Sequence, residues 1–364
     1  MALECNQGRK DEKYMGIMEW LRKSESLVFW NRCRLHSRKE DFRKLVLEGY
    51  HNPDYLELQH FGNEYEGCII YNANETGNGM GFFAELGMTL IKLYFADKRG
   101  LKPYISWGEG YVYYEPQGVE GEKNAFLYYF KPASEVSSVN NASYVVNQKP
   151  WHCEQVKKIF EAVSYEVSDA YIDAMAGMLK KYISYNDKIQ KYLEQEYQNL
   201  LGDERTVAVH YRGTDFNRGY NNHPVPVQVE QEINKVRELL EHRGYKQIFL
   251  ATDEDKIVQQ FRQEFGEMVK VYEDTYRDYG TGESIAFSKA ERELHHYLLG
   301  REVLRDQYTL TRCEGLVCGY SNITFIARIM RKAWYESTWD DFCLINNGIN
   351  HNKNTFSNSR KGKQ

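Results

Sequence analysis

The spacing of hydrophobic positions changes along the chain and predicts an order of elements in the first half. Residues 14–60 show apolar positions near helical spacing, without a recognisable chemical motif. Over residues 66–107 a short apolar strand, a glycine-bearing loop, an amphipathic helix and a second strand predict a β-α-β unit. Residues 111–150 hold aromatic runs between polar turns, and we expect them to be irregular and to face a cleft. The pattern from Trp151 to Leu201 predicts helices.

The alternation of strands and helices starts again after a polar turn at residues 202–204. Strands are expected at 206–210, 246–253, 268–273 and 315–319, and helices at 227–243, 255–265, 290–312 and 321–334. Such alternation predicts a parallel sheet covered on both faces. The predicted fold class is therefore α/β, with two Rossmann-like domains at 1–202 and 203–335. A segment at 336–364 follows, and its polar end is expected to be disordered.

Composition narrows the function classes. The chain has 364 residues, 42% of them hydrophobic, and its formal net charge of -5 is spread evenly, so no basic stripe indicates nucleic acid. The seven cysteines include no C-x-x-C pair, so neither disulfides nor zinc are indicated. His295 and His296 are expected at the surface and lack further ligands at metal-binding spacing. No apolar secretory segment opens the chain, and no window approaches the roughly 20 apolar residues of a membrane span. A cytoplasmic protein is expected.

Three strands of the second half end in clusters of polar residues. His210, Arg212 and Asp215 follow the first, Asp253 follows the second, and Ser321 and Asn322 follow the last and open a helix. Ligands of open parallel sheets bind beyond the carboxyl ends of the strands. An arginine there can fork onto phosphate oxygens, and a serine at a helix N-terminus adds donors to the same anion. Arg212 and Ser321 together therefore predict a pyrophosphate site.

Each of these residues also has a purely structural explanation. Arg212 can form a bridge with Asp215, and Ser321 can act only as the cap of its helix. Asp253 and Asp255 have the spacing of a metal-binding Asp-x-Asp pair, but a helix cap explains them equally well. The sequence leaves these alternatives open.

Two further features lie away from this cluster. A loop with glycines at positions 77, 79 and 81 precedes the helix of the first half, but it lacks the G-x-G-x-x-G order of a dinucleotide site. It is either a tight turn or a loop along which a substrate approaches the backbone. Asp306 falls near the middle of a helix with an apolar face, where an unpaired buried carboxylate would be costly, so it needs solvent or a partner.

The order of these motifs resembles one family. His-Tyr-Arg-Gly-Thr-Asp at 210–215, Ala-Thr-Asp-Glu at 251–254 and the run from Asp306 to Asn322 follow one another as in certain GDP-fucose transferases. These are the enzymes related to the nodulation fucosyltransferase and the core alpha-1,6-fucosyltransferase of N-glycans. The glycine loop and its helix also resemble the N-terminal part of that family. The resemblance covers residues 66–107 and 205–332.

The resemblance implies a fold and a set of roles. Two Rossmann-like domains would face each other across a cleft, the GT-B arrangement, with the acceptor on 1–202 and the nucleotide sugar on 203–335. It implies that Arg212 and Ser321 hold the β-phosphate of the donor and that His210 and Asp306 contact guanine. The same implied donor site includes Asn322, Asp253, Gly79 and Gly81.

The sequence departs from the family at three positions. Gly213 replaces a second arginine, so additional positive charge would come from Arg218 or Arg277. The glutamine of the family's glycine loop is missing, with Ala84 and Glu85 in its neighbourhood. The glutamate that would serve as the base is also missing, and the candidates to replace it are Asp215, Glu85 and Glu283.

The sequence thus predicts an inverting, metal-independent glycosyltransferase without a cofactor, which moves L-fucose from GDP-fucose onto a hydroxyl of a glycan or glycoconjugate. Arg212, Asp215 and Glu85 are the predicted catalytic residues. A membrane-bound acceptor would bring peripheral membrane association, and no nucleic-acid partner is expected. The alternatives are a transferase that uses another nucleotide sugar and a carbohydrate- or nucleotide-binding protein without catalysis.

Overall fold

A computed structural model describes residues 56–77, 79–162, 165, 167–214, 218–278, 280 and 284–351. The chain divides into two compact units, residues 1–58 and 59–364, and the second unit holds all the elements of the predicted site. Residues 14–55, expected to be helical, lie outside the described residues, as does the polar end at 352–364.

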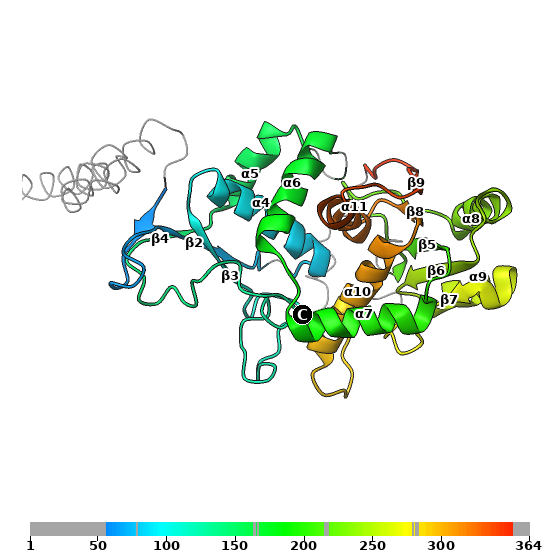
Figure 1. The fold of residues 1–364 in the computed structure, drawn as a ribbon, viewed down its shortest axis with the longest axis horizontal. Coiled ribbons are helices and arrows are strands. Elements are labelled where there is room, and N and C mark those ends of the chain that lie inside the picture. The colour runs from blue at the N-terminus through cyan, green and yellow to red at the C-terminus, as the bar shows by residue number, and fades with distance from the viewer. Residues whose placement is uncertain are drawn as a thin grey trace, which may run out of the picture. The chain divides into compact units, whose positions relative to one another are not determined.

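The first half contains the predicted β-α-β unit. Its elements are β1 (Leu58–Gln59), β2 (Ile70–Asn74), α4 (Phe82–Asp97), β3 (Lys102–Ser106) and β4 (Val145–Asn147). In this four-stranded sheet β4, β2 and β3 lie side by side and parallel, and α4 joins β2 to β3. The helical stretch that follows forms α5 (Pro150–Ile159), α6 (Asp169–Tyr182) and α7 (Asp187–Leu201), and α5 and α6 pack on α4 (Figure 1).

The aromatic segment between β3 and β4 is irregular, as predicted, but it does not face a cleft. Tyr113, Tyr129 and Phe130 are each less than 10% exposed and surround Phe82, with ring centroids 5.0–6.1 Å from it. The prediction of cleft-facing rings was wrong because large aromatic surfaces are stabilised more by packing on one another than by contact with water.

The second half forms a five-stranded parallel sheet in the order β7-β6-β5-β8-β9. The strands are β5 (Thr206–Tyr211), β6 (Gln247–Thr252), β7 (Val269–Lys270), β8 (Gly315–Gly319) and β9 (Asp341–Ile345). The connecting elements are α8 (Val229–Arg243), α9 (Asp255–Phe265), η2 (Gly266–Met268), η3 (Ile285–Phe287), α10 (His295–Arg312) and α11 (Asn322–Tyr335).

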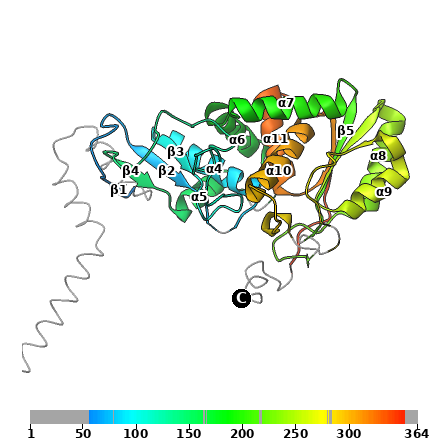
Figure 2. The same ribbon diagram turned by 90° about the horizontal axis from the view of Figure 1, so that it is seen from below.

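Both faces of this second sheet are covered, as predicted. Val207 and Val209 of β5 share one hydrophobic cluster with residues of α8 and α9, whereas Ala208 shares the other with α7, α10 and α11. Figure 2 shows α8 and α9 on one side of the sheet and α10 and α11 on the other. Successive residues of β5 point to opposite faces of the sheet, and all six are buried. This fits a parallel sheet that is covered on both faces.

Two of the polar contacts between the two halves lie at the start of α10. The hydroxyl of Tyr129 donates to the carbonyl oxygen of Tyr297 (3.1 Å), and the backbone N–H of Tyr297 donates to Glu115 (3.0 Å). The predicted domain boundary at residue 202, where α7 ends and leads into β5, stays a prediction. No helix among the described residues has both the length and the apolar composition that crossing a membrane takes.

Candidate functional site

The predicted polar cluster lies at one edge of the second sheet. His210 is the second-last residue of β5, and Arg212 directly follows this strand. Asp253 follows β6, and Ser321 follows β8. Because the strands are parallel, their carboxyl ends meet at the same edge, which is where ligands of such sheets bind.

Asp253 organises the loop that carries Arg212. Its carboxylate forms an ion pair with the Arg212 guanidinium and accepts hydrogen bonds from the backbone N–H of Gly213 (3.0 Å) and the hydroxyl of Thr214 (2.8 Å). Thr214 has a φ of 47°, which is unfavourable for a β-branched residue, so these bonds hold a strained turn. Asp253 therefore binds the Arg212 loop rather than capping α9, whose cap residue makes no side-chain cap bond. Asp215, the other proposed partner of Arg212, lies outside the described residues.

Arg212 remains partly accessible despite this ion pair. Its side chain is 30% exposed, against 14% for Asp253. It lines a pocket with an empty volume of about 260 Å³, whose other walls come from the ends of β5 and β8, the loop before α8, and α8 itself. The lining residues are His210, Arg212, Val225, Val227, Glu232, Gly319 and Tyr320.

Ser321 caps α11 and also contacts His210. Its hydroxyl accepts from the N–H of Thr324 (3.1 Å), the Thr324 hydroxyl accepts from the N–H of Ser321 (3.0 Å), and the Ser321 hydroxyl lies 3.4 Å from Nδ1 of His210. Burial, with a contribution from the Arg212 charge, lowers the pKa of His210 to about 3, so its imidazole is neutral at physiological pH. Ser321 thus caps α11 and lies beside His210, and its role toward a phosphate stays a prediction.

Asn322, the first residue of α11, is exposed and lies beside a tyrosine that the sequence reasoning missed. Tyr165 hydrogen-bonds Asn322, and the Arg212 charge also acts on it. Burial raises the pKa of Tyr165, while those two neighbours lower it. Its ring lies 6.3 Å from that of Tyr320. A residue of the first half therefore contacts the Arg212 edge, and no spacing in the sequence indicates this contact.

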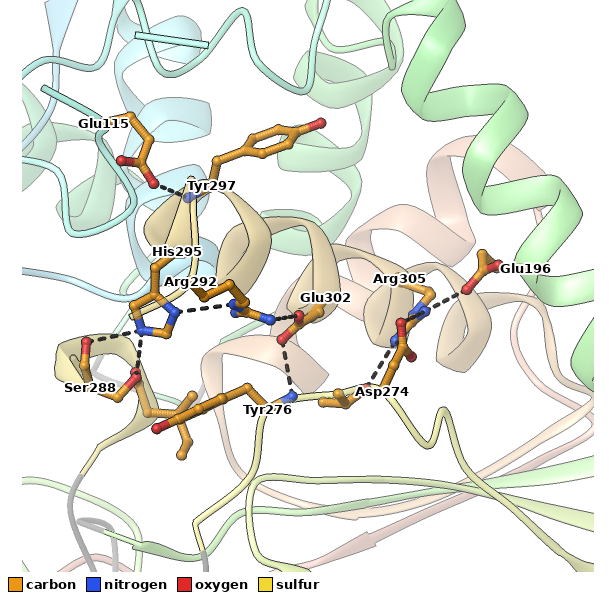
Figure 3. Close-up of polar contacts among 12 residues, drawn as sticks. Glu115, Glu196, Asp274, Tyr276, Ser288, Arg292, His295, Tyr297, Glu302 and Arg305 are labelled. Carbon is orange, nitrogen blue, oxygen red and sulfur yellow. Dashed lines mark hydrogen bonds and ion pairs between the residues drawn. The ribbon is translucent and has the colours of Figure 1, made fainter. Parts of the chain in front are cut away.

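Asp306 belongs to a separate polar cluster on α10. Burial raises its pKa to about 7, while the charges of Arg305 and Arg277 act in the opposite direction. Figure 3 shows the Arg305 guanidinium reaching Asp274 and Glu196. Arg277 is itself buried, and its terminal nitrogen donates to the backbone carbonyl of Tyr272 (2.8 Å); its role toward the diphosphate stays a prediction.

The cluster around Asp306 continues toward the N-terminus of α10. There, Glu302 accepts from Arg292 (2.6 Å) and from the backbone N–H of Tyr276 (3.1 Å), and Arg292 also donates to His295 (3.3 Å), as Figure 3 shows. His295 was expected at the surface, but it is 6% exposed because these contacts and Ser288 enclose it.

Glu85 supports the glycine loop. It is 1% exposed, accepts from the backbone N–H and the hydroxyl of Thr76 (both 2.9 Å), and pairs with buried Lys92 (3.3 Å). These contacts assign its carboxylate to holding the loop, and its role as the base stays a prediction. Gly79 adopts a φ of 63°, which suits glycine, whereas Gly81 has an ordinary φ of -66° at the cap of α4.

Gly213, which replaces the family's second arginine, has no room for a side chain. A Cβ atom there would lie 2.3 Å from the carboxyl group of Glu254, which is buried and accepts from the N–H of Thr214 (3.0 Å). The departure from the family pattern is therefore built into the packing of this loop. Arg218 is exposed, and Glu283 lies outside the described residues.

Glu232 is a second residue that sequence reasoning missed. It lines the pocket beside His210 and Arg212, and it is 1% exposed. A signal was present in the sequence, because Glu232 stands between Val229 and Val236 on the buried stripe of α8, where an apolar residue is expected.

Comparisons with known proteins gave matches to solved structures. No protein-family model matches the sequence, and the comparison with curated proteins gave no match. The chain is similar to the NodZ alpha-1,6-fucosyltransferase soaked with GDP-fucose, at 17% identity and a TM-score of 0.47 over 72% of this chain and 92% of that chain. It is similar to the fucosyltransferase NodZ from Bradyrhizobium at 17% identity and a TM-score of 0.45, over 71% of this chain and 92% of that chain. It is also similar to POFUT1 in complex with GDP-fucose at 11% identity and a TM-score of 0.45, over 79% of this chain and 100% of that chain. Fucosyltransferases thus stand among the structures to which the chain is similar.

Proposed function

We propose that the protein is a glycosyltransferase that takes its sugar from a nucleoside diphosphate sugar, with GDP-fucose as the favoured donor. One observation carries this proposal. Arg212 is fixed in orientation by Asp253, remains 30% exposed, and shares a pocket with His210 next to the capped N-terminus of α11. A guanidinium beside a helix N-terminus is a site for an anion such as a diphosphate.

The proposed mechanism stabilises the departing diphosphate without a metal ion. As the bond between the sugar and the donor breaks, negative charge grows on the phosphate oxygens. The guanidinium of Arg212 and the N-terminus of α11 at Ser321 are placed to stabilise that charge. An acceptor hydroxyl that attacks from the opposite face, in a GT-B cleft between the two halves, would invert the anomeric configuration.

The base is the least constrained part of this mechanism. Glu85 is buried against Thr76 and Lys92, and Asp253 is engaged by the Arg212 loop. We therefore place Asp215, one residue beyond that loop in the sequence, first among the predicted bases. The acceptor is proposed to be a glycan or glycoconjugate, and the cytoplasmic location stays a prediction.

Calorimetry with GDP tests the proposed donor site. We expect Arg212→Ala to weaken GDP binding by about 2–3 kcal/mol, because a charge-assisted hydrogen bond to phosphate is lost. The matched control is Arg237→Ala on α8, where an exposed arginine pairs with Glu264 and should leave GDP affinity unchanged. Equal GDP affinity of the wild type and Arg212→Ala would reject the assignment.

A nucleotide-binding protein without transfer activity is the second candidate. The engaged state of Glu85 and Asp253 favours it, because neither carboxylate is placed to accept a proton from an acceptor hydroxyl. Thermal-shift screening of GDP, UDP and CDP sugars identifies the donor through ligand stabilisation. Slow hydrolysis of the stabilising sugar nucleotide then supports the transferase, whereas binding without any turnover supports the second candidate.

A further inference from the structure

A buried carboxyl group lies at the pocket without a partner. Neither oxygen of Glu232 has a hydrogen-bond partner among the described residues, and the side chain is 1% exposed. Burying a polar group without a hydrogen bond destabilises a fold. An apolar residue would complete the stripe of Val229, Val236 and Leu239 on α8 without that cost. The position therefore carries a carboxyl that packing alone does not explain.

The surroundings determine which hydrogen bonds this carboxyl can form. Val225, Val227 and Gly319 share the pocket wall with it, and burial raises its pKa well above the usual range of a glutamic acid. Burial thus favours the protonated form of the carboxyl, which has one O–H donor and one carbonyl acceptor. A ligand that matches it must offer both an acceptor and a donor on neighbouring atoms.

Three ligand groups can be compared on this basis. A divalent cation is disfavoured because it needs several oxygen ligands, and Arg212 places a positive charge in the same pocket. The two adjacent N–H donors of a guanine edge need an ionised carboxylate, which burial opposes. The two hydroxyls of a vicinal diol each donate and accept, so they match the protonated acid and also the ionised one.

The pocket brings Glu232 next to the proposed diphosphate site, because both Glu232 and Arg212 line it. In a nucleotide the ribose is directly attached to the phosphates. A group that shares the pocket with Arg212 therefore lies where the sugar is expected.

We propose that Glu232 binds the ribose diol of the donor nucleotide and so sets its preference for ribonucleotides. This inference rests on the proposed nucleotide site and adds a residue to it. Solvent does not reach the carboxyl oxygens, so side chains of the wall, Val225 or Val227, turn aside when the diol enters.

The test compares GDP with 2′-deoxyguanosine diphosphate by calorimetry on the wild type and on Glu232→Leu. The wild type should bind GDP about 5–10 times more tightly than the deoxy form, as expected for one hydrogen bond. Glu232→Leu should bind both nucleotides equally, at the affinity of the wild type for the deoxy form. Glu232→Gln, which keeps a donor and an acceptor, should restore most of the preference. Glu230→Leu, the same change at an exposed position of α8, is the control and should keep the full preference.

Thermal unfolding separates this role from a structural one. Because Glu232→Leu removes an unpartnered buried acid, its midpoint should rise by about 2–4 °C while the nucleotide preference is lost. A lower midpoint would mean that the carboxyl supports the fold and would overturn the inference. Tight GDP binding with an unchanged preference in Glu232→Leu overturns the role of Glu232 alone. Absence of GDP binding in the wild type overturns the proposed function and the inference together.

Discussion

Replacement of Asp253 by alanine tests how the Arg212 loop is held. The substitution removes the acceptor of two hydrogen bonds, from the N–H of Gly213 and the hydroxyl of Thr214, and one partly exposed ion pair with Arg212. Hydrogen bonds to a charged group contribute about 1.5–3 kcal/mol each, and a pair with exposed surface about 0–1 kcal/mol. These contributions are not additive, because the three donors share one carboxylate and lie on one loop.

We expect Asp253→Ala to lower the free energy of unfolding by about 2–4 kcal/mol. Asp253→Asn keeps one acceptor oxygen and should lose about half as much. GDP affinity should fall in both variants, because Arg212 loses the group that orients it and Thr214 can leave its strained conformation at φ 47°. Denaturant titration measures the first effect and calorimetry the second.

Asp255→Ala is the matched control, because within the described part of the chain the Asp255 carboxylate accepts only from Gln259, on the exposed side of α9 (2.6 Å). Its stability should stay within about 0.5 kcal/mol of the wild type. If Asp253→Ala unfolds at the same denaturant concentration as the wild type, Asp253 does not hold this loop and the reasoning is refuted.

Three further predictions follow from packing and burial. Gly300→Ala should lower the free energy of unfolding by about 1–3 kcal/mol in denaturant titration, because the Cβ of the alanine would lie 2.2 Å from the Tyr129 hydroxyl. This loss is expected although alanine has a better helix propensity than glycine. Gly213→Arg should likewise lose about 1–3 kcal/mol and gain no GDP affinity in calorimetry, because Glu254 occupies the space for its side chain. Asp306→Asn should raise the free energy of unfolding by about 2–4 kcal/mol at pH 8 and have little effect on it at pH 4, measured by the same titration.

The sign of the Asp306 effect follows from its pKa. The folded protein holds this proton up to a pKa of about 7, whereas an unfolded aspartate loses it near 3.9. The folded state therefore loses stability as the pH rises from about 4 to about 7, and asparagine removes that loss. An equal effect of Asp306→Asn at both pH values would contradict the assignment. For the glycine variants, Gly177→Ala at an exposed position of α6 is the control and should raise the free energy of unfolding by about 0.5–1 kcal/mol, because nothing lies near its Cβ.

The sequence was most informative where the hydrophobic pattern was strong. Strand β8 and helix α9 have the predicted bounds, and β5 extends only one residue further, because continuous apolar runs between polar turns define buried parallel strands. The prediction failed at β9, which was placed in a C-terminal segment outside the sheet. Its sequence, Asp-Phe-Cys-Leu-Ile, is apolar at four of five positions, so a strand signal was present and was missed.

The site was predictable only in part, for a different reason. The polar residues after β5, β6 and β8 were found because parallel topology alone brings strand ends together. The partners of their side chains depend on how the loops turn. Asp253 was weighed both as a helix cap and as a donor-site residue, and its carboxylate holds the Arg212 loop. Glu85 was predicted to be catalytic, and its carboxylate accepts from Thr76. Tyr165 reaches the site from the first half, and such long-range contacts leave no periodic pattern in the sequence.

A crystal structure of the protein soaked with GDP tests the central claim most directly. The account predicts the diphosphate within about 2.7–3.2 Å of the Arg212 guanidinium and of the N–H or hydroxyl donors at the start of α11. Diphosphate density at another edge of the sheet, with Arg212 in contact only with Asp253, would contradict it.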